Sequence, residues 1–133
     1  MKTTKILSLI AFLFCFTLNL RAQSGTCGAN LTWELVNDTL IITGSGAMDN
    51  SRPWSSYSSK IVHVSISEGV TNICDEAFEF HRNLLSVIIP NTVTSVGQRA
   101  FNNCTSLKQI TMSNAVETIG SSAFNETAIT SIT

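Results

Sequence analysis

Hydrophobic positions recur along the second half of the chain at a spacing of 23 residues. The phrases VTNICDEAF, VTSVGQRAF and VETIGSSAF begin at Val70, Val93 and Val116. The aligned apolar columns are Ile61/Leu84/Leu107, Val64/Val87/Ile110, Ile66/Ile89/Met112, Val70/Val93/Val116, Ile73/Val96/Ile119 and the Ala-Phe pairs at 77–78, 100–101 and 123–124. One such unit cannot bury its apolar columns alone, whereas stacked units make the columns continuous. The pattern therefore predicts a solenoid of stacked coils.

Each repeat unit is predicted to contain a strand, a turn, a second short extended piece and a helical turn. The segments VSI, VII and ITM are rich in β-branched residues and alternate between inward and outward positions. Gly97 and Gly120 precede QRAF and SSAF, where we expect the chain to turn tightly into a helical segment. The Phe of each segment is predicted to be the large inward anchor. The predicted class is an α/β repeat solenoid with short strands and short helical turns.

Two further alternating runs, 31–36 and 39–46, flank Asn37 and Asp38 and predict a β-hairpin. We expect this hairpin to cover the open end of the first coil as an N-terminal cap, since solenoids need capped ends. Trp33 and Trp54 are expected to pack inside the cap, and an aromatic platform for carbohydrate is the alternative. The predicted domains are the cap at 23–59 and, at 60–133, about three repeats with the start of a fourth.

The first 22 residues have the features of a secretory signal peptide. Lys2 and Lys5 precede an apolar run from Ile6 to Leu18, and cleavage is predicted after Ala22. A membrane anchor is the alternative, but the run is shorter than the roughly 20 apolar residues that a spanning helix needs. We therefore expect an exported protein, secreted or at the cell surface, with no transmembrane span after cleavage.

The net charge of the chain argues against one class of binding partner, nucleic acids. Residues 23–133 carry five basic and nine acidic side chains, which gives a net charge of −4 with both histidines neutral. A nucleic-acid-binding protein would need a basic patch, so no nucleic-acid partner is expected.

The repeat pattern L-x-x-V-x-I-P-x-x-V-x-x-I-G-x-x-A-F-x-x-C resembles the BspA-like class of leucine-rich repeat, and the stretch LLSVIIPNTVTSVGQRAFNNCTSL matches it along almost its whole length. The first unit departs from the pattern, with Cys74 in place of the glycine and His81 in place of the cysteine. The resemblance implies a secreted or surface bacterial protein, and some members look like adhesins that hold host matrix proteins or neighbouring cells. The leading expectation is a binding or adhesion module for a protein or glycan; the alternative is a structural or assembly segment of a longer surface protein.

The sequence offers little for catalysis. It contains no Gly-rich phosphate loop, no H-E-x-x-H and no G-x-S-x-G motif, so we predict neither an enzyme nor a cofactor or metal site. His81 is expected to be structural. The binding candidates are instead the outward strand positions, which form rows across the coils: His63, Ser65, Leu85, Ser86, Ile88, Lys108, Gln109 and Thr111. Leu85 and Ile88 would make a small apolar patch there.

Three cysteines follow the predicted cleavage site, and their pairing has two alternatives. Export permits disulfides, but an odd count leaves at least one thiol free. If a bridge forms, we predict Cys27–Cys74, because Cys104 is displaced from Cys74 by seven positions in the repeat register. Three buried, reduced thiols are the other alternative.

The last coil is incomplete in this sequence. Ile129 and Ile132 repeat the roles of Leu107 and Ile110 and start a fourth strand. The apolar columns of the third unit then lack a neighbour beyond that strand. We therefore expect either self-association through this C-terminal edge or further repeats in the natural form.

Overall fold

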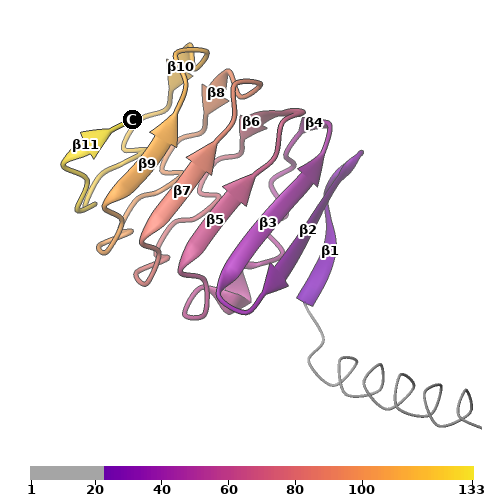
Figure 1. Ribbon diagram of the computed structural model, residues 1–133, viewed down its shortest axis with the longest axis horizontal. Coiled ribbons are helices and arrows are strands. Elements are labelled where there is room, and N and C mark those ends of the chain that lie inside the picture. The colour runs from indigo at the N-terminus through magenta and orange to yellow at the C-terminus, as the bar shows by residue number, and fades with distance from the viewer. Residues whose placement is uncertain (1–22) are drawn as a thin grey trace, which may run out of the picture.

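The computed structural model describes residues 23–133. Its coils stack into a β-solenoid with two sheets, which run along opposite sides of the stack (Figure 1). The seven-stranded sheet has the order β1 (Gln23–Gly28), β2 (Leu31–Val36), β3 (Thr39–Gly44), β5 (His63–Ile66), β7 (Ser86–Ile89), β9 (Gln109–Met112) and β11 (Ser131–Ile132). The four-stranded sheet has the order β10 (Thr118–Ile119), β8 (Ser95–Val96), β6 (Val70–Ile73) and β4 (Gly46–Ala47). The signal peptide predicted at 1–22 lies outside the described residues.

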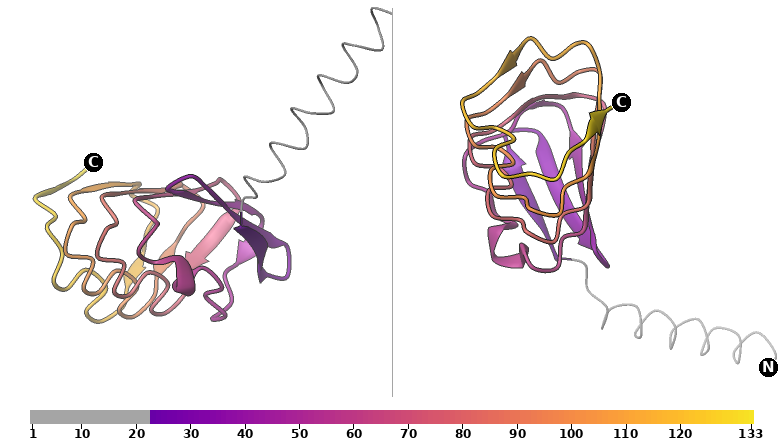
Figure 2. Two further views of the ribbon diagram at one scale, coloured as in Figure 1. Left: turned by 90° about the horizontal axis from the view of Figure 1, so that it is seen from below. Right: turned by 90° about the vertical axis from the view of Figure 1, so that its left-hand side faces the viewer.

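Parallel pairing between coils follows the repeat. Val64 pairs with Val87, and Val87 with Ile110, so the steps from β5 to β7 and from β7 to β9 are each one 23-residue period. Ile132 pairs with Ile110, which confirms that the fourth unit begins where the sequence predicted. The view along the stack shows successive coils enclosing one continuous interior (Figure 2). The inward columns of Val, Ile, Leu and Phe fill that interior, and most of them are buried.

The prediction of a helical turn in each repeat is wrong. Among residues 23–133 the structure has no α-helix and a single short 3₁₀-helix, η1 (Ser55–Tyr57). The segments around the Ala-Phe pairs are runs of tight turns, because Glu76 and Phe80 adopt left-handed backbone angles, with φ of 55° and 62°. Backbone donors there bond to the next coil rather than along a helix: the amide of Phe78 donates to the carbonyl of Ala100 at 2.7 Å. The fold is therefore a repeat β-solenoid with little helix, and not an α/β one.

The repeated glycines serve a different purpose from the one expected. Gly97 and Gly120 are not among the glycines with positive φ. A Cβ atom on Gly97 would lie 2.5 Å from the backbone nitrogen of Asp75, and one on Gly120 would collide with the backbone of Gln98. These glycines therefore allow the backbones of adjacent coils to approach closely. Cys74 occupies the same position in the first coil, where a side chain fits and is buried.

A column of aromatic rings runs through the stack. Trp54, Phe78, Phe101 and Phe124 follow one another with centroid separations of 5.5, 5.1 and 5.3 Å. The indole of Trp54 donates its hydrogen bond to the carbonyl of Ala77 at 2.8 Å. Trp33 meets Trp54 edge to face, and both indoles are buried. The packing role predicted for the two tryptophans is confirmed, and a carbohydrate platform made of them is excluded because neither face is open.

The hairpin before the repeats forms as predicted. Strands β2 and β3 pair antiparallel from Val36 with Thr39 to Leu31 with Gly44, and Asn37 in the two-residue turn has a φ of 56°. Strand β3 then pairs in parallel with β5, so the hairpin continues the sheet of the first coil. Strand β1, which pairs antiparallel with β2, was not predicted from the sequence. Within residues 23–133 no helix is long and apolar enough to cross a membrane.

Candidate functional site

The outward side of the seven-stranded sheet, called the strand face below, carries the predicted binding residues. The sheet register aligns His63, Ser86 and Gln109 in one row. It aligns Ser65, Ile88 and Thr111 in a second row, two positions further along the strands. The structure therefore brings together six of the candidates on adjacent strands.

Leu85 and Lys108 lie just before β7 and β9 and extend the strand face at that end. The amide of Leu85 donates to the carbonyl of Val62 at 2.7 Å, and the amide of Lys108 donates to the carbonyl of Leu85 at 3.1 Å. These bonds fix the two residues in line with the sheet although they lie outside the strands.

The strand face combines exposed apolar side chains with hydroxyl and amide groups. Leu85 is 42% exposed and Ile88 is 52% exposed, which is high for large apolar residues. The hydroxyl of Ser86 lies 2.6 Å from Nδ1 of His63, so these two side chains hold each other in place. The result is a small apolar patch on an otherwise polar and mostly uncharged surface.

The hairpin also contributes side chains to the strand face, which the sequence did not lead us to predict. Thr39 continues the row of His63, and Ile41 continues the row of Ser65, because β3 pairs with β5. Val36 on β2 pairs with Thr39 and is 38% exposed. The signal was the alternation of 31–36, in which Leu31, Trp33 and Leu35 are buried and Val36 points outward with the polar positions.

The three cysteines in the described part of the chain are free and buried. Burial, reinforced by the nearby Asp49 charge, raises the pKa of the Cys27 thiol to about 11. Burial likewise raises the pKa of Cys74 and of Cys104 to about 12, and the Cys104 thiol donates to the carbonyl of Phe78 at 3.0 Å. Thiols with such a pKa are protonated at neutral pH and unreactive. The Cys27–Cys74 bridge stays a prediction.

His81 has the structural position that the sequence predicted. It is 1% exposed, its ring meets Phe78 edge to face, and Nδ1 lies 3.2 Å from the carbonyl of Glu79. Its Nε2 has no hydrogen-bond partner. Burial lowers the pKa of His81, so the neutral imidazole is favoured in the folded protein.

This buried imidazole predicts a loss of stability on mild acidification. Unfolded His81 binds a proton near pH 6.5, whereas the folded residue resists protonation, so the unfolded state binds more protons below that pH. The free energy of unfolding should therefore be fully retained above pH 6.5 and fall below it, by at most about 1.4 kcal/mol per pH unit. Urea melts between pH 7.5 and 5.5 measure this slope. His81→Cys, with the residue found at Cys104, should flatten it under reducing conditions; an unchanged slope would assign the effect to other groups.

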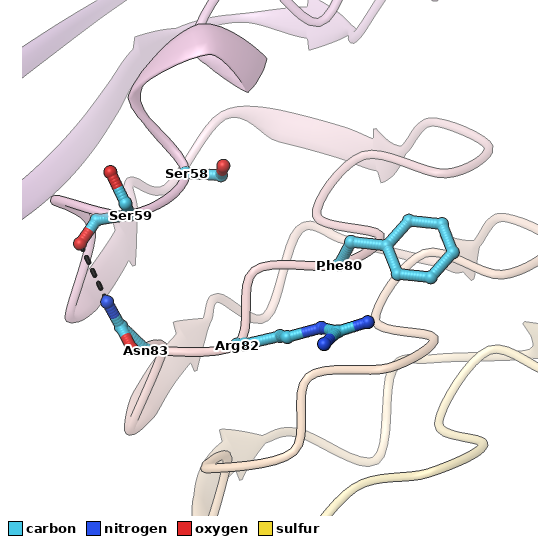
Figure 3. A pocket seen from close by; sticks show the side chains of 5 residues that line it. All are labelled: Ser58, Ser59, Phe80, Arg82 and Asn83. Carbon is cyan, nitrogen blue, oxygen red and sulfur yellow. Dashed lines mark hydrogen bonds between the residues drawn. The ribbon is translucent and has the colours of Figure 1, made fainter.

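Other chemistry is sparse in the part of the chain that the structure describes. Residues 23–133 contain no group of three or more His, Cys, Asp or Glu side chains that could hold a metal ion. A shallow pocket of about 170 Å³ lies between Ser58, Ser59, Phe80, Arg82 and Asn83 (Figure 3). None of its lining residues is among the candidates of the strand face.

Comparison with known proteins agrees with this fold. The family model described as the BspA type leucine-rich repeat region (6 copies) matches residues 55–133. A crystal structure of a leucine-rich repeat protein from Eubacterium ventriosum ATCC 27560 is similar, with a TM-score of 0.66 and 21% identity over 85% of this chain and 40% of that one. The leucine-rich repeat protein of T. pallidum gives a TM-score of 0.54 and 20% identity over 84% of this chain and 67% of that one. The chain thus spans less than half of the first of these proteins. No curated protein sequence matches it.

Proposed function

The chain belongs to the BspA-type leucine-rich repeat family, and from this premise we propose that it is a non-catalytic binding module that contacts a protein through the strand face. Members of leucine-rich repeat families are generally protein-interaction modules. Stacked coils create an extended surface on which each coil contributes a few side chains. The observation that carries the proposal is the pair of exposed apolar residues on this surface, Ile88 within β7 and Leu85 just before it.

The composition of the strand face fits a protein partner. Interfaces have apolar centres that are poor in charge and polar rims that remain hydrated. Leu85 and Ile88 supply the apolar area, while Ser86, Gln109 and Thr111 supply hydroxyl and amide groups beside it. Lys108 is the charged group among the candidates and lies at the end of the surface. A glycan partner at the same face is the less favoured variant, since no exposed aromatic ring belongs to it.

We also propose that the protein acts outside the cell, as a secreted or surface adhesion module for host matrix proteins or neighbouring cells. The basic and apolar segment at 1–22 supports export as a signal peptide. In this arrangement residues 23–59 form an N-terminal cap and residues 60–133 form the repeats. The pairing of β3 with β5 supports the cap, because the hairpin covers one side of the first repeat strand.

A matched pair of substitutions tests the strand face. Ile88→Asp should weaken binding to a matrix protein by about tenfold or more, because it places a charge at the centre of the interface. Thr71→Asp is the control, since Thr71 is also exposed but lies on β6 of the other sheet. Binding of the wild-type chain to immobilised matrix proteins identifies the partner, and titration of both variants gives the affinities. Equal affinity of Ile88→Asp and wild type would remove the strand face as the site.

Assembly is the second candidate function, and the C-terminal edge favours it. Strands β10 and β11 are the last members of their sheets, and their residues Ile119 and Ile132 are 52% and 50% exposed. Exposed apolar residues on an open strand edge promote pairing with another chain. Sedimentation over a concentration series should then show association of the wild-type chain that Ile132→Lys abolishes. A wild-type chain that stays monomeric at the highest concentration would exclude this function for the edge.

A further inference from the structure

Phe80 breaks the repeat at an exposed position. Its ring is 52% exposed, and its backbone φ is 62°. The same position in the following coils holds Asn103 and Glu126, with φ of 59° and 55°. Asn visits this left-handed region readily, whereas a bulky aromatic residue there is an outlier that costs stability. The fold therefore does not require a phenylalanine here, and the strain at an exposed site points to a role other than packing.

Phe80 forms one side of the pocket shown in Figure 3. The guanidinium of Arg82 lies 5.9 Å from the centre of the Phe80 ring. Across the pocket the side-chain amide of Asn83 donates to the carbonyl of Ser59 at 2.8 Å, which leaves the oxygen of that amide as an acceptor. The side chains of Ser58 and Ser59 complete the lining, so hydroxyl and amide groups face an aromatic ring and a cation.

Arg82 differs from the other arginines of the described chain in its electrostatic partners. Arg52 and Arg99 both lie near the carboxylate of Glu76, at 2.8 and 4.0 Å, whereas no salt bridge is found for Arg82 within residues 23–133. The neighbouring acid, Glu79, accepts a hydrogen bond from Asn102 at 2.8 Å. In a chain of net negative charge, Arg82 thus presents a guanidinium that can bind a carboxylate through two parallel hydrogen bonds.

We propose that this pocket binds a hexuronic acid, a carboxylated sugar ring, as one residue of an acidic glycan. The carboxylate pairs with Arg82, and apolar C–H groups of the sugar pack against the part of the Phe80 ring that Arg82 leaves exposed. The sugar hydroxyls exchange hydrogen bonds with Ser58, Ser59 and Asn83, whose groups include both donors and acceptors. A pocket of about 170 Å³ is smaller than the roughly 300–1,000 Å³ of drug-sized sites, which fits a single ring. The lining residues differ from those of the strand face, so this proposal does not depend on the proposed function.

Calorimetric titration of the purified full chain with a galacturonic acid trimer tests the proposal. The trimer is expected to bind, and the neutral galactose trimer is expected to bind at least tenfold more weakly. Arg82→Gln and Phe80→Asn should each weaken binding of the acidic trimer about tenfold or more, while Ile88→Asp on the strand face leaves it unchanged. Failure of Ile88→Asp to bind a matrix protein is a separate result, so the two sites are tested independently.

Thermal melts of the variants complete the test. Phe80→Asn should keep or raise the melting temperature, because it restores the residue found at Asn103 and relieves the strained backbone. A fall of more than about 5 °C would show that Phe80 serves the fold, and would overturn its assignment to a ligand. Equal binding of the neutral trimer, or no binding of the acidic trimer at millimolar concentration, would overturn the sugar site. Binding of an acidic tetrapeptide without binding of the acidic trimer would also overturn the sugar site, since the pocket would then be a peptide site.

Discussion

Replacing Phe101 with Ala is expected to lower the free energy of unfolding by about 3–5 kcal/mol. Phe101 is fully buried, and its ring stacks between Phe78 and Phe124 at centroid distances of 5.1 and 5.3 Å. Truncation removes both stacking contacts and leaves a cavity between coils that paired strands hold at a fixed spacing. Urea denaturation followed by circular dichroism measures the loss.

Phe124→Ala is the matched comparison, because the same residue type occupies the same repeat position one coil later. Phe124 is only partly buried and packs against the core from its margin, and in the aromatic column it stacks on Phe101 alone. Its truncation should therefore cost clearly less than that of Phe101, since the site is already open on one side. Equal losses in the two variants would contradict this order of burial and the continuous column of rings.

Gly97→Ala is expected to destabilise the fold by about 1–3 kcal/mol although it adds a single methyl group. The new Cβ would lie 2.5 Å from the backbone nitrogen of Asp75 and 2.6 Å from the carbonyl carbon of Cys74. Backbone atoms of a paired coil cannot move aside as the end of a flexible side chain can. The spacing of the two coils must therefore increase, which weakens the strand pairing beside it.

The control for this substitution is Gln98→Ala at the exposed neighbouring position. The bond between the Gln98 amide and the Asp75 carboxylate, at 2.8 Å, uses the backbone of Gln98 and survives the change. This variant should stay within about 0.5 kcal/mol of the wild type. If Gly97→Ala were as stable as the wild type, the adjacent coils would have space for a Cβ atom at this position, which contradicts the close backbone contact in the structure.

The sequence predicted the features of the fold that depend on side-chain periodicity. Alignment of Val64, Val87 and Ile110 was sufficient to give the register, because only one register places all the apolar columns inside. The hairpin was likewise predicted from alternation around Asn37 and Asp38. These patterns record burial directly, and burial dominates the stability of a stacked solenoid.

Features set by the backbone were not predictable in the same way. The segments around Ala77 and Ala100 have compositions that suit a helical turn, but each contains two left-handed residues, Glu76 and Phe80 in the first and Arg99 and Asn103 in the second. Glu and Arg side chains have no preference that would predict left-handed backbone angles. Strand β1 was missed because QSGTCG lacks alternating apolar residues. Its pairing comes from hydrogen bonds to β2 rather than from its own pattern.

The two candidate sites also differ in how far the sequence predicts them. The rows of the strand face followed from the repeat period, whereas the pocket at Phe80 depends on a departure from it. The signal for this pocket was an aromatic residue where the following coils have Asn103 and Glu126. A comparison of exposed positions between repeats would have detected it, while the search for conserved inward columns could not.

The 23-residue period places equivalent side chains at the same height in successive coils, which builds both the core and the strand face. Nuclear Overhauser contacts measured in solution test this register. Backbone contacts of Val87 with Ile110 and of Ile88 with Thr111 are expected, because these residues are paired in adjacent strands. Contacts displaced by one residue would contradict it, since a slip of one position turns the inward columns outward and moves Ile88 into the core.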